Sequence, residues 1–193
     1  MRWSQILFSQ GFGTRRVCTG LIDAGLVRCQ GRVVQADDEE FEPEEGLLFE
    51  VEGQPWAYHR SALVMLYKPA GYECSQKPRH HPSVLSLLPT PLRQRGVQPI
   101  GRLDEDTTGL LLLTDDGALL HKLTSPKHHV PKVYEVGAKH PITPQQVDKL
   151  LAGVVLDDDP RPVRADAAEQ TGELALRLTL TQGKYHQVKR MLA

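Results

Sequence analysis

The sequence contains few cysteines and few aromatic residues, and it lacks any long apolar run. Its three cysteines, Cys18, Cys29 and Cys74, form no C-x-x-C pair, so they favour neither a disulfide framework nor a zinc site. No apolar stretch approaches the roughly 20 residues that span a bilayer. The first ten residues, MRWSQILFSQ, contain neither a continuous apolar segment nor a small-residue cleavage site, which argues against a signal or transit peptide. We therefore expect a protein of the reducing cytoplasm that has no membrane partner.

The chain also has little net charge, but its charges are unevenly distributed. The total is −1 over 193 residues. Residues 1–36 contain five arginines and one aspartate, whereas residues 37–52 contain nine acidic and no basic residues. The remainder holds 18 basic and 14 acidic residues. A basic beginning and a mildly basic body are typical of a polyanion-binding surface, and from charge alone they are equally typical of a solvated one.

The first 52 residues predict a small module of two helices and a hairpin. Helical spacing of apolar residues predicts a helix over 3–10, and Thr14 can cap a second helix that ends near Gly25. The segment LVRCQGRVV predicts two short strands around a Gln-Gly turn. With Arg15 and Arg16 at the start of the second helix, this arrangement resembles the S4 RNA-binding domain. The resemblance implies that both arginines contact RNA.

The rest of the chain predicts a linker and a second, larger domain. Residues 53–61 (GQPWAYHRS) are expected to be the linker, and the domain is expected over 62–193. Strands are predicted at LVMLYKP, KVYEV and ELALRLTLT, and helices at DDGALLHKLT and TPQQVDKLLAG. In TPQQVDKLLAG, Thr143 is expected to cap the helix with Gln146 as its capping-box partner. In ELALRLTLT, alternation places four leucines on one face: Leu174, Leu176, Leu178 and Leu180. The run LLLLT predicts a fully buried strand, although its pattern also suits a helix.

These elements predict an α+β fold with a mostly antiparallel mixed sheet, because strands and helices are interspersed without strict alternation. The final segment, GKYHQVKRMLA, predicts an amphipathic helix without a cap. Helix ends normally need partners for their last carbonyls, so we expect the C-terminal end of the domain to be truncated.

The segment GRLDEDTTGLLLLTDDG places an arginine and an aspartate just ahead of a predicted strand. Gly101 and Gly109 permit tight turns, so Arg102 and Asp104 are expected on a short loop, where function is commonly carried. An isolated R-x-D is more often a surface ion pair of little consequence. This segment alone leaves both interpretations open, a functional loop and a surface ion pair.

Three segments together resemble the active-site motifs of pseudouridine synthases that carry an N-terminal S4 domain: GRLDEDTTGLLLLTDDG, KVYEV and GKYHQVKRM, in this order. KPAGYECS and HPSVLSLLP are also similar to that family. Within it, SPKHHVPKVYEV is most similar to the bacterial enzymes that modify 16S ribosomal RNA. The resemblance implies a monomeric isomerase that needs no metal or cofactor and acts on ribosomal RNA in a small-subunit assembly particle.

The resemblance also assigns roles to individual residues. Asp104 would be the catalytic carboxylate that acts at the ribose, and Lys189 the cation that keeps it ionised. Tyr134 would stack on the target uracil, an interaction worth about 1–3 kcal/mol, although core packing in KVYEV explains this tyrosine equally well. Arg102 would fill the space left by the flipped nucleotide or hold its phosphate. The residues expected to bind the RNA backbone are Lys132, Lys184 and Arg190.

Other interpretations remain open. The adjacent pairs His80-His81 and His128-His129 invite a metal site, but adjacent side chains seldom face one ion and no further ligand motif accompanies them. RNA contact or exposure to solvent explains these histidines better. A large-subunit enzyme of the same family, or a non-catalytic assembly factor that binds ribosomal RNA, would also fit the sequence.

Overall fold

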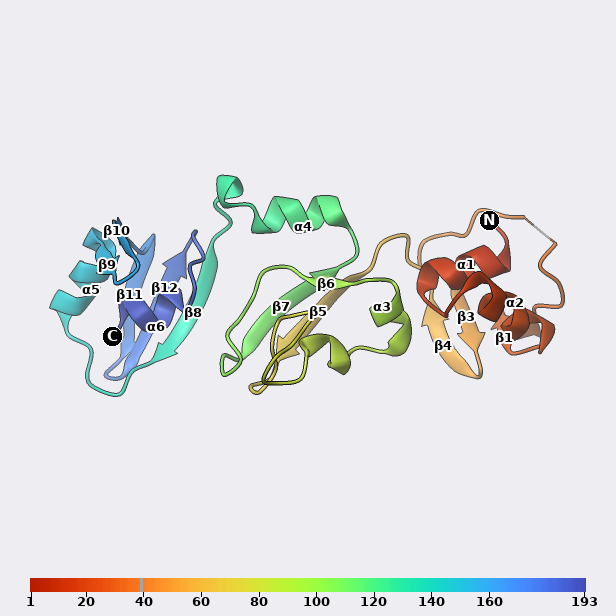
Figure 1. Cartoon of the computed structure of the whole chain (residues 1–193), viewed down its shortest axis with the longest axis horizontal. Helices are drawn as coiled ribbons and strands as arrows, with labels where there is room; N and C mark the ends of the chain where they lie inside the picture. Colours follow the sequence, from red (N-terminus) through yellow and green to blue (C-terminus); the bar gives the residue numbers. More distant parts are fainter. Residues whose placement is uncertain (39) are drawn as a thin grey trace. The chain divides into compact units, whose positions relative to one another are not determined.

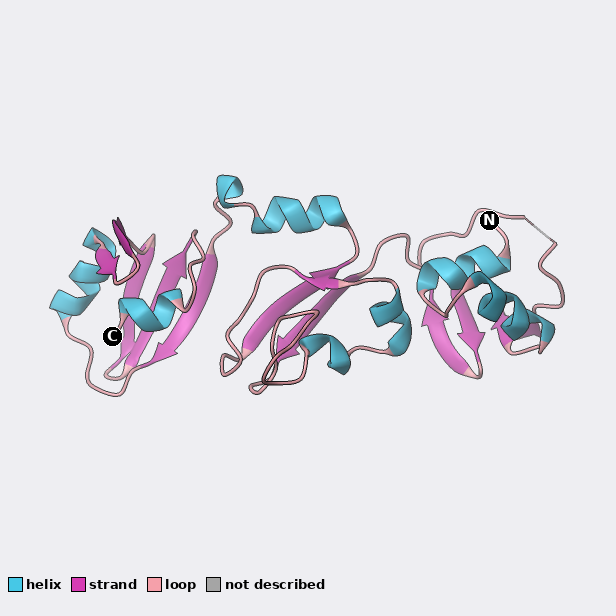
Figure 2. Cartoon of the chain, in the orientation of Figure 1, coloured by secondary structure: helices cyan, strands magenta, loops and turns pink. Residues whose placement is uncertain are grey.

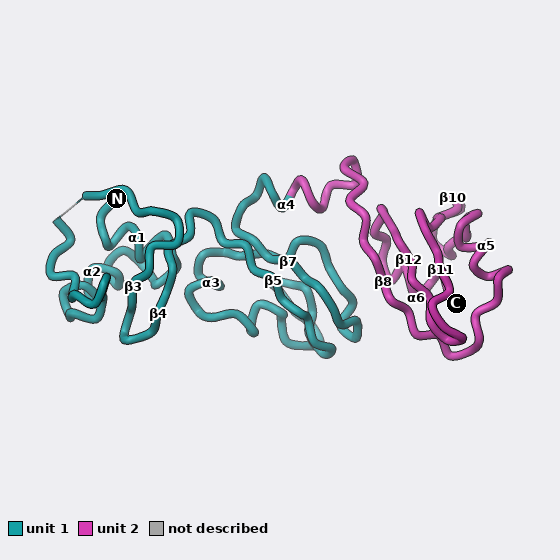
Figure 3. The backbone as a smooth tube through the Cα atoms, turned by 180° about the vertical axis from the view of Figure 1, so that it is seen from behind, with its two compact units in different colours: residues 1–120 teal, residues 121–193 magenta. Residues whose placement is uncertain are grey.

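The computed structural model describes residues 1–38 and 40–193, which form two compact units, Met1–Leu120 and His121–Ala193 (Figure 3). Both units combine helices with sheets (Figure 2). The strand pairings within the sheets are antiparallel. The α+β class that the sequence predicted is therefore confirmed. Within the described residues, no helix has the length and apolar character needed to cross a membrane.

The N-terminal part of the first unit contains the two predicted helices and a four-stranded sheet (Figure 1). The helices are α1 (Trp3–Gln10) and α2 (Arg15–Asp23), and Thr14 caps α2 by accepting from the Val17 amide at 3.3 Å. The sheet has the order β2-β1-β3-β4. Its strands are β1 (Val27–Cys29), β2 (Arg32–Val33), β3 (Leu48–Val51) and β4 (Gln54–Ala57).

The segment expected as a linker carries regular structure. Gln54–Ala57 form β4, which pairs with β3, and Tyr58 lies in the core of the N-terminal module with 4% of its surface exposed. In an extended linker, the backbone of Gln54–Ala57 would have no strand partner and the side chain of Tyr58 would be exposed to solvent. The division of the chain into residues 1–52, 53–61 and 62–193 stays a prediction.

The second sheet of the first unit has the order β5-β7-β6. Its strands are β5 (Leu63–Lys68), β6 (Gln98–Pro99) and β7 (Gly109–Thr114), and its helical segments are η1 (Val84–Leu87) and α3 (Thr90–Gln94). Helix α4 (Gly117–Thr124) contains the boundary between the two units, at Leu120 and His121. The run LLLLT is a strand, as predicted, but it is not fully buried. Leu111 is 3% exposed and Leu110 is 63% exposed, because adjacent residues of a strand point to opposite faces of the sheet.

The second unit is built on the sheet β11-β12-β8 and the hairpin β9-β10. The strands are β8 (Lys132–Gly137), β9 (Val154–Leu156), β10 (Asp159–Val163), β11 (Ala167–Gly172) and β12 (Ala175–Leu180). The helical segments are η2 (Pro126–His128), α5 (Pro144–Ala152) and α6 (Gln187–Met191). Three alternate leucines of β12 lie in the core, at 0–1% exposure: Leu176, Leu178 and Leu180. Leu174, expected on the same face, precedes the strand and is 46% exposed.

Helix α5 begins with the capping box that its sequence predicted. Thr143 accepts from the Gln146 amide at 3.3 Å, and the Gln146 side chain accepts from the Thr143 amide at 2.9 Å. This reciprocal capping box satisfies backbone donors that the first turn of a helix otherwise leaves without partners.

Candidate active site

The loop that carries Asp104 lies at one end of the β5-β7 pair. Lys68, the last residue of β5, is paired with Gly109, the first residue of β7. Residues 101–108 therefore enter the sheet beside the point where β5 leaves it. Within this loop, the Thr107 amide donates to the Asp104 carbonyl at 3.1 Å, which closes a tight turn just after Asp104. The Asp104 residue itself is half-buried.

Lys68 binds the backbone of this loop through its ammonium group. Its side chain is completely buried, and its ammonium donates to the carbonyls of Pro69, Glu105 and Thr107 at 3.0, 3.0 and 2.8 Å. Burying an ammonium is costly unless hydrogen bonds replace its water. Three carbonyl acceptors do so here, and two of them belong to the turn that follows Asp104. The position of the Asp104 backbone is thus tied to the end of β5.

A second loop, residues 71–83, packs along the Asp104 loop. The Gly71 amide donates to the Glu105 carbonyl at 2.8 Å, and the Leu103 amide donates to the Cys74 sulfur at 3.4 Å. The side chains of His81 and Glu105 are 3.8 Å apart. These contacts brace the GRLD segment on both sides of Asp104.

Glu73 organises this second loop. Its carboxylate accepts hydrogen bonds from the amides of Arg79, His80 and His81 at 3.1, 2.8 and 2.9 Å. These three bonds stabilise the ionised form and lower the pKa of Glu73 to about 2. The loop is therefore held in one conformation by an acid from its own beginning.

The other predicted residues of the first unit lie on its surface. Arg102 is exposed on the GRLD loop. Arg15 and Arg16 are exposed at the start of α2, where the Arg15 guanidinium lies 5.5 Å from the centre of the Phe8 ring. Both side chains are therefore accessible from solvent.

Tyr134 and Lys189 belong to the second unit. Tyr134 lies on β8 opposite Leu178 of β12, half-buried, and packs against the core of that unit. Lys189 is exposed on α6, next to Val188, which packs against the same core. The core of the second unit therefore supports both the strand of Tyr134 and the helix of Lys189.

The predicted backbone-binding residues are Lys132, Lys184 and Arg190. Lys132 donates to the Val130 carbonyl at 3.1 Å. Arg190 donates to the carboxylate of Asp158, which lowers the pKa of that acid, and to the Tyr185 carbonyl at 3.1 Å. The guanidinium of Arg190 is thus already engaged within the second unit.

Two residues with structural roles at the site, Lys68 and Glu73, were missed by sequence reasoning. The sequence did contain a signal for Lys68, which directly follows the apolar run LVMLY and precedes a proline. A lysine at the end of a buried strand indicates a site with acceptors for its charge, because lysine is almost never fully buried unless its charge is satisfied. Nothing in the sequence pointed to Glu73. Across the described residues, no cluster of three or more His, Cys, Asp or Glu side chains could hold a metal ion.

The chain is similar to known proteins over nearly its whole length. Residues 62–193 match the family model described as RNA pseudouridylate synthase. The chain is 37% identical to YtzG of Bacillus subtilis (strain 168), described as an uncharacterized RNA pseudouridine synthase, over 99% of this chain and 81% of that protein. It is 36% identical to ribosomal small subunit pseudouridine synthase A of Escherichia coli (strain K12), over 96% of this chain and 80% of that protein.

A solved structure supports the same assignment. The crystal structure of a pseudouridylate synthase matches with a TM-score of 0.64 and 31% sequence identity, and the match covers 99% of this chain and 81% of that one. The chain therefore belongs to the RNA pseudouridine synthase family, and it is an isomerase.

Proposed function

We propose that this protein converts a specific uridine of 16S ribosomal RNA into pseudouridine, with Asp104 as the catalytic residue. The support for the substrate is the 36% identity to proteins named ribosomal small subunit pseudouridine synthase A, from Escherichia coli (strain K12) and Vibrio parahaemolyticus. The observation that carries the assignment of the residue is the braced loop, in which a half-buried Asp104 precedes a turn tied to Lys68.

The reaction requires one carboxylate and a fixed geometry. The N1–C1′ bond of the nucleotide breaks, the uracil turns within the site, and a C5–C1′ bond forms, after which C5 loses its proton and N1 gains one. Nothing is oxidised and no group leaves. Asp104 would act at the ribose, either as a nucleophile at C1′ or as a base at C2′, as carboxylates do in other reactions at glycosidic bonds.

The remaining side chains would bind and orient the nucleotide. Tyr134 would stack on the uracil, and its hydroxyl would assist removal of the C5 proton, while Lys189 would keep the carboxylate ionised. Extruding a base costs a few kcal/mol, and Arg102 would offset this by occupying the vacated space or holding the phosphate. The residues proposed to contact the RNA backbone are Lys132, Lys184 and Arg190, which would position the RNA without reading its sequence.

We further propose that residues 1–52 form an S4-like RNA-binding domain and that the catalytic domain spans 62–193. The enzyme would act as a monomer on RNA within a small-subunit assembly particle. Arg15 and Arg16 would supply the electrostatic part of binding. Reversing both charges is expected to weaken RNA binding and to flatten its dependence on salt, since each lost phosphate contact reduces the slope of log K against log salt by about 0.7–0.9. An unchanged slope would contradict this role.

The test of the catalytic assignment is the pair Asp104→Asn and Asp106→Asn. The two changes remove the same charge two positions apart on one loop. We expect Asp104→Asn to abolish pseudouridine formation in 16S RNA and in small-subunit particles while RNA binding is retained, and Asp106→Asn to remain active. Mapping of pseudouridine positions in the RNA is the measurement. Normal activity of Asp104→Asn would reject the mechanism, and modification of 23S RNA alone would reject the proposed substrate.

A further inference from the structure

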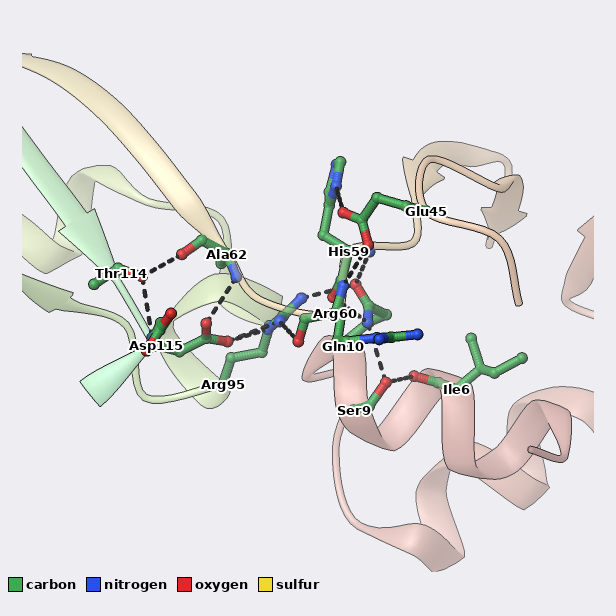
Figure 4. A network of polar contacts seen from close by, with 11 residues as sticks. Ile6, Ser9, Gln10, Glu45, His59, Arg60, Ala62, Arg95, Thr114 and Asp115 are labelled. Atoms are coloured by element: carbon green, nitrogen blue, oxygen red, sulfur yellow. Dashed lines mark hydrogen bonds and ion pairs between the residues drawn. The ribbon is translucent and has the colours of Figure 1, made fainter. Parts of the chain in front are cut away.

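A network of hydrogen bonds joins the N-terminal module to the β5-β7-β6 sheet within the first unit. It consists of the side chains of Gln10, Arg95 and Asp115 and the backbone groups of His59 and Arg60, and we call it the polar junction (Figure 4). Gln10 ends helix α1, Arg95 follows α3, and Asp115 follows β7. Gln10 and Arg95, which are directly hydrogen-bonded here, are 85 positions apart in sequence.

Arg95 is the centre of the polar junction. Its side chain is 4% exposed. Nε and Nη2 both lie 2.7 Å from Oδ2 of Asp115, Nη1 donates to Oε1 of Gln10 at 2.8 Å, and Nη2 also lies 3.3 Å from the Arg60 carbonyl. The other oxygen of Asp115 accepts from the Ala62 amide at 2.7 Å. A planar guanidinium can bridge several acceptors in fixed directions, which an ammonium cannot do.

Gln10 is the contribution of the N-terminal module. It is fully buried, and its side chain pairs with the backbone of His59 in both directions, accepting from its amide at 3.1 Å and donating to its carbonyl at 3.0 Å. Its amide nitrogen also donates to the Ser9 hydroxyl at 3.1 Å. Its amide group is thus fully engaged, so the end of α1 has one favoured position.

Steric contact reinforces this position. Gly11, at the C-terminal end of α1, has a left-handed φ of +86°, and a Cβ placed there would lie 2.0 Å from the Pro91 carbonyl oxygen and 2.9 Å from Arg95. The backbone of α1 therefore meets the backbone of α3 without room for a side chain. Polar and steric contacts together fasten the module to the sheet, where the sequence had predicted only a linker.

The polar junction and Asp104 stand at opposite ends of β7. Asp115 follows the last residue of this strand, and the Asp104 loop leads into its first residue, Gly109. Six residues at about 3.3 Å each give a rigid spacing of roughly 20 Å. A module fastened at one end of a paired strand is consequently held at a fixed offset from a loop braced at the other end.

We propose that Arg95 is a positioning residue for substrate selection: it fixes the N-terminal module relative to β7, so that RNA bound by the module presents one uridine to Asp104. This rests on the proposed function, in which Arg15 and Arg16 bind RNA. Burying an ion pair often gains no stability over apolar packing, and a fixed geometry is what this pair supplies. A freely jointed module would still bind RNA, but at a lower effective concentration and without a defined register.

The experiment compares Gln10→Ala, Arg95→Gln and Arg95→Lys with the control Arg93→Gln, a neighbouring exposed arginine that donates to Thr90 at 2.9 Å. Gln10→Ala leaves the Arg95–Asp115 pair intact, so it keeps the test informative if Arg95→Gln fails to fold. Residual dipolar couplings of backbone amides in the N-terminal module and in the β5-β7-β6 sheet, measured without RNA, report release of the module, because they show whether the two parts keep one common orientation. Steady-state kinetics and pseudouridine mapping on a 16S RNA transcript report its consequence.

We expect the two parts to lose their common orientation in Gln10→Ala and Arg95→Gln, a KM higher on the order of tenfold because part of the effective concentration is lost, and kcat changed less than about twofold. Pseudouridine should also appear at neighbouring uridines. Arg95→Lys should restore KM only in part, and the control should match the wild type. The proposal is overturned if the module is released while KM and the modified position stay unchanged, or if kcat falls with KM unaltered.

The test separates this proposal from the proposed substrate. If the wild type modifies 23S RNA and leaves the 16S transcript unmodified, the substrate is wrong, and the same comparison is then made with the RNA that is modified. The dipolar couplings require no RNA, so they test the fastening of the module independently of either substrate.

Discussion

Replacing Lys68 tests whether the braced loop matters for catalysis. In Lys68→Met the alkyl stem is retained, but the carbonyls of Pro69, Glu105 and Thr107 lose their donor. Hydrogen bonds from a charged donor contribute about 1.5–3 kcal/mol each. Removing the ammonium also removes the penalty of several kcal/mol for burying a charge, so we expect the free energy of unfolding to fall by about 2–4 kcal/mol.

The rate of the folded variant should fall as well. Because the turn after Asp104 would no longer be tied to β5, the carboxylate would shift, and a misplacement of about 1 Å costs roughly 100-fold in rate. Single-turnover rates on 16S RNA, measured where circular dichroism shows both proteins folded, separate this loss from unfolding. The control is Lys77→Met, the same replacement at an exposed lysine. A folded Lys68→Met enzyme with the wild-type rate would refute the reasoning.

Two further changes test the local structure. Glu73→Gln is expected to lower the melting temperature near neutral pH, because the folded-state pKa of about 2 lies below the ordinary value of 4.5. This stabilisation is complete above the ordinary value and is lost as pH falls toward the folded value, so thermal melts of the two proteins should converge over that window; a constant difference would contradict it. Thr143→Ala should lower the free energy of unfolding by about 1 kcal/mol in urea titrations without changing activity. Thr143→Ser, which keeps the capping oxygen, should behave as wild type, and equal losses in both variants would disprove the cap.

Local features were predictable because neighbouring residues determine them. The helix cap at Thr14 and the capping box at Thr143 follow from side chains that bond amides three residues away. The turn at Gln30 and Gly31 follows from two adjacent residues with φ of 51° and 76°. The family motifs were equally readable, since they are short and contiguous in the sequence.

Contacts between distant segments were not predictable. Leucine spacing could not show that one side of β7 stays exposed at Leu110, because burial depends on what packs against each face of the sheet. The linker interpretation missed β4 for the same reason, since Gln54–Ala57 become a strand only by pairing with β3.

The sequence by itself determined the α+β class, the ends of the main helices and the identity of the loop that carries Asp104, because propensity, capping and short motifs act over a few residues. Only the tertiary structure decided that Lys68 is buried beneath that loop and that Arg95 joins Gln10 to Asp115. A buried charge is stable only where the folded chain brings acceptors to it. Those acceptors come from segments as much as 85 residues away, and no local pattern records them.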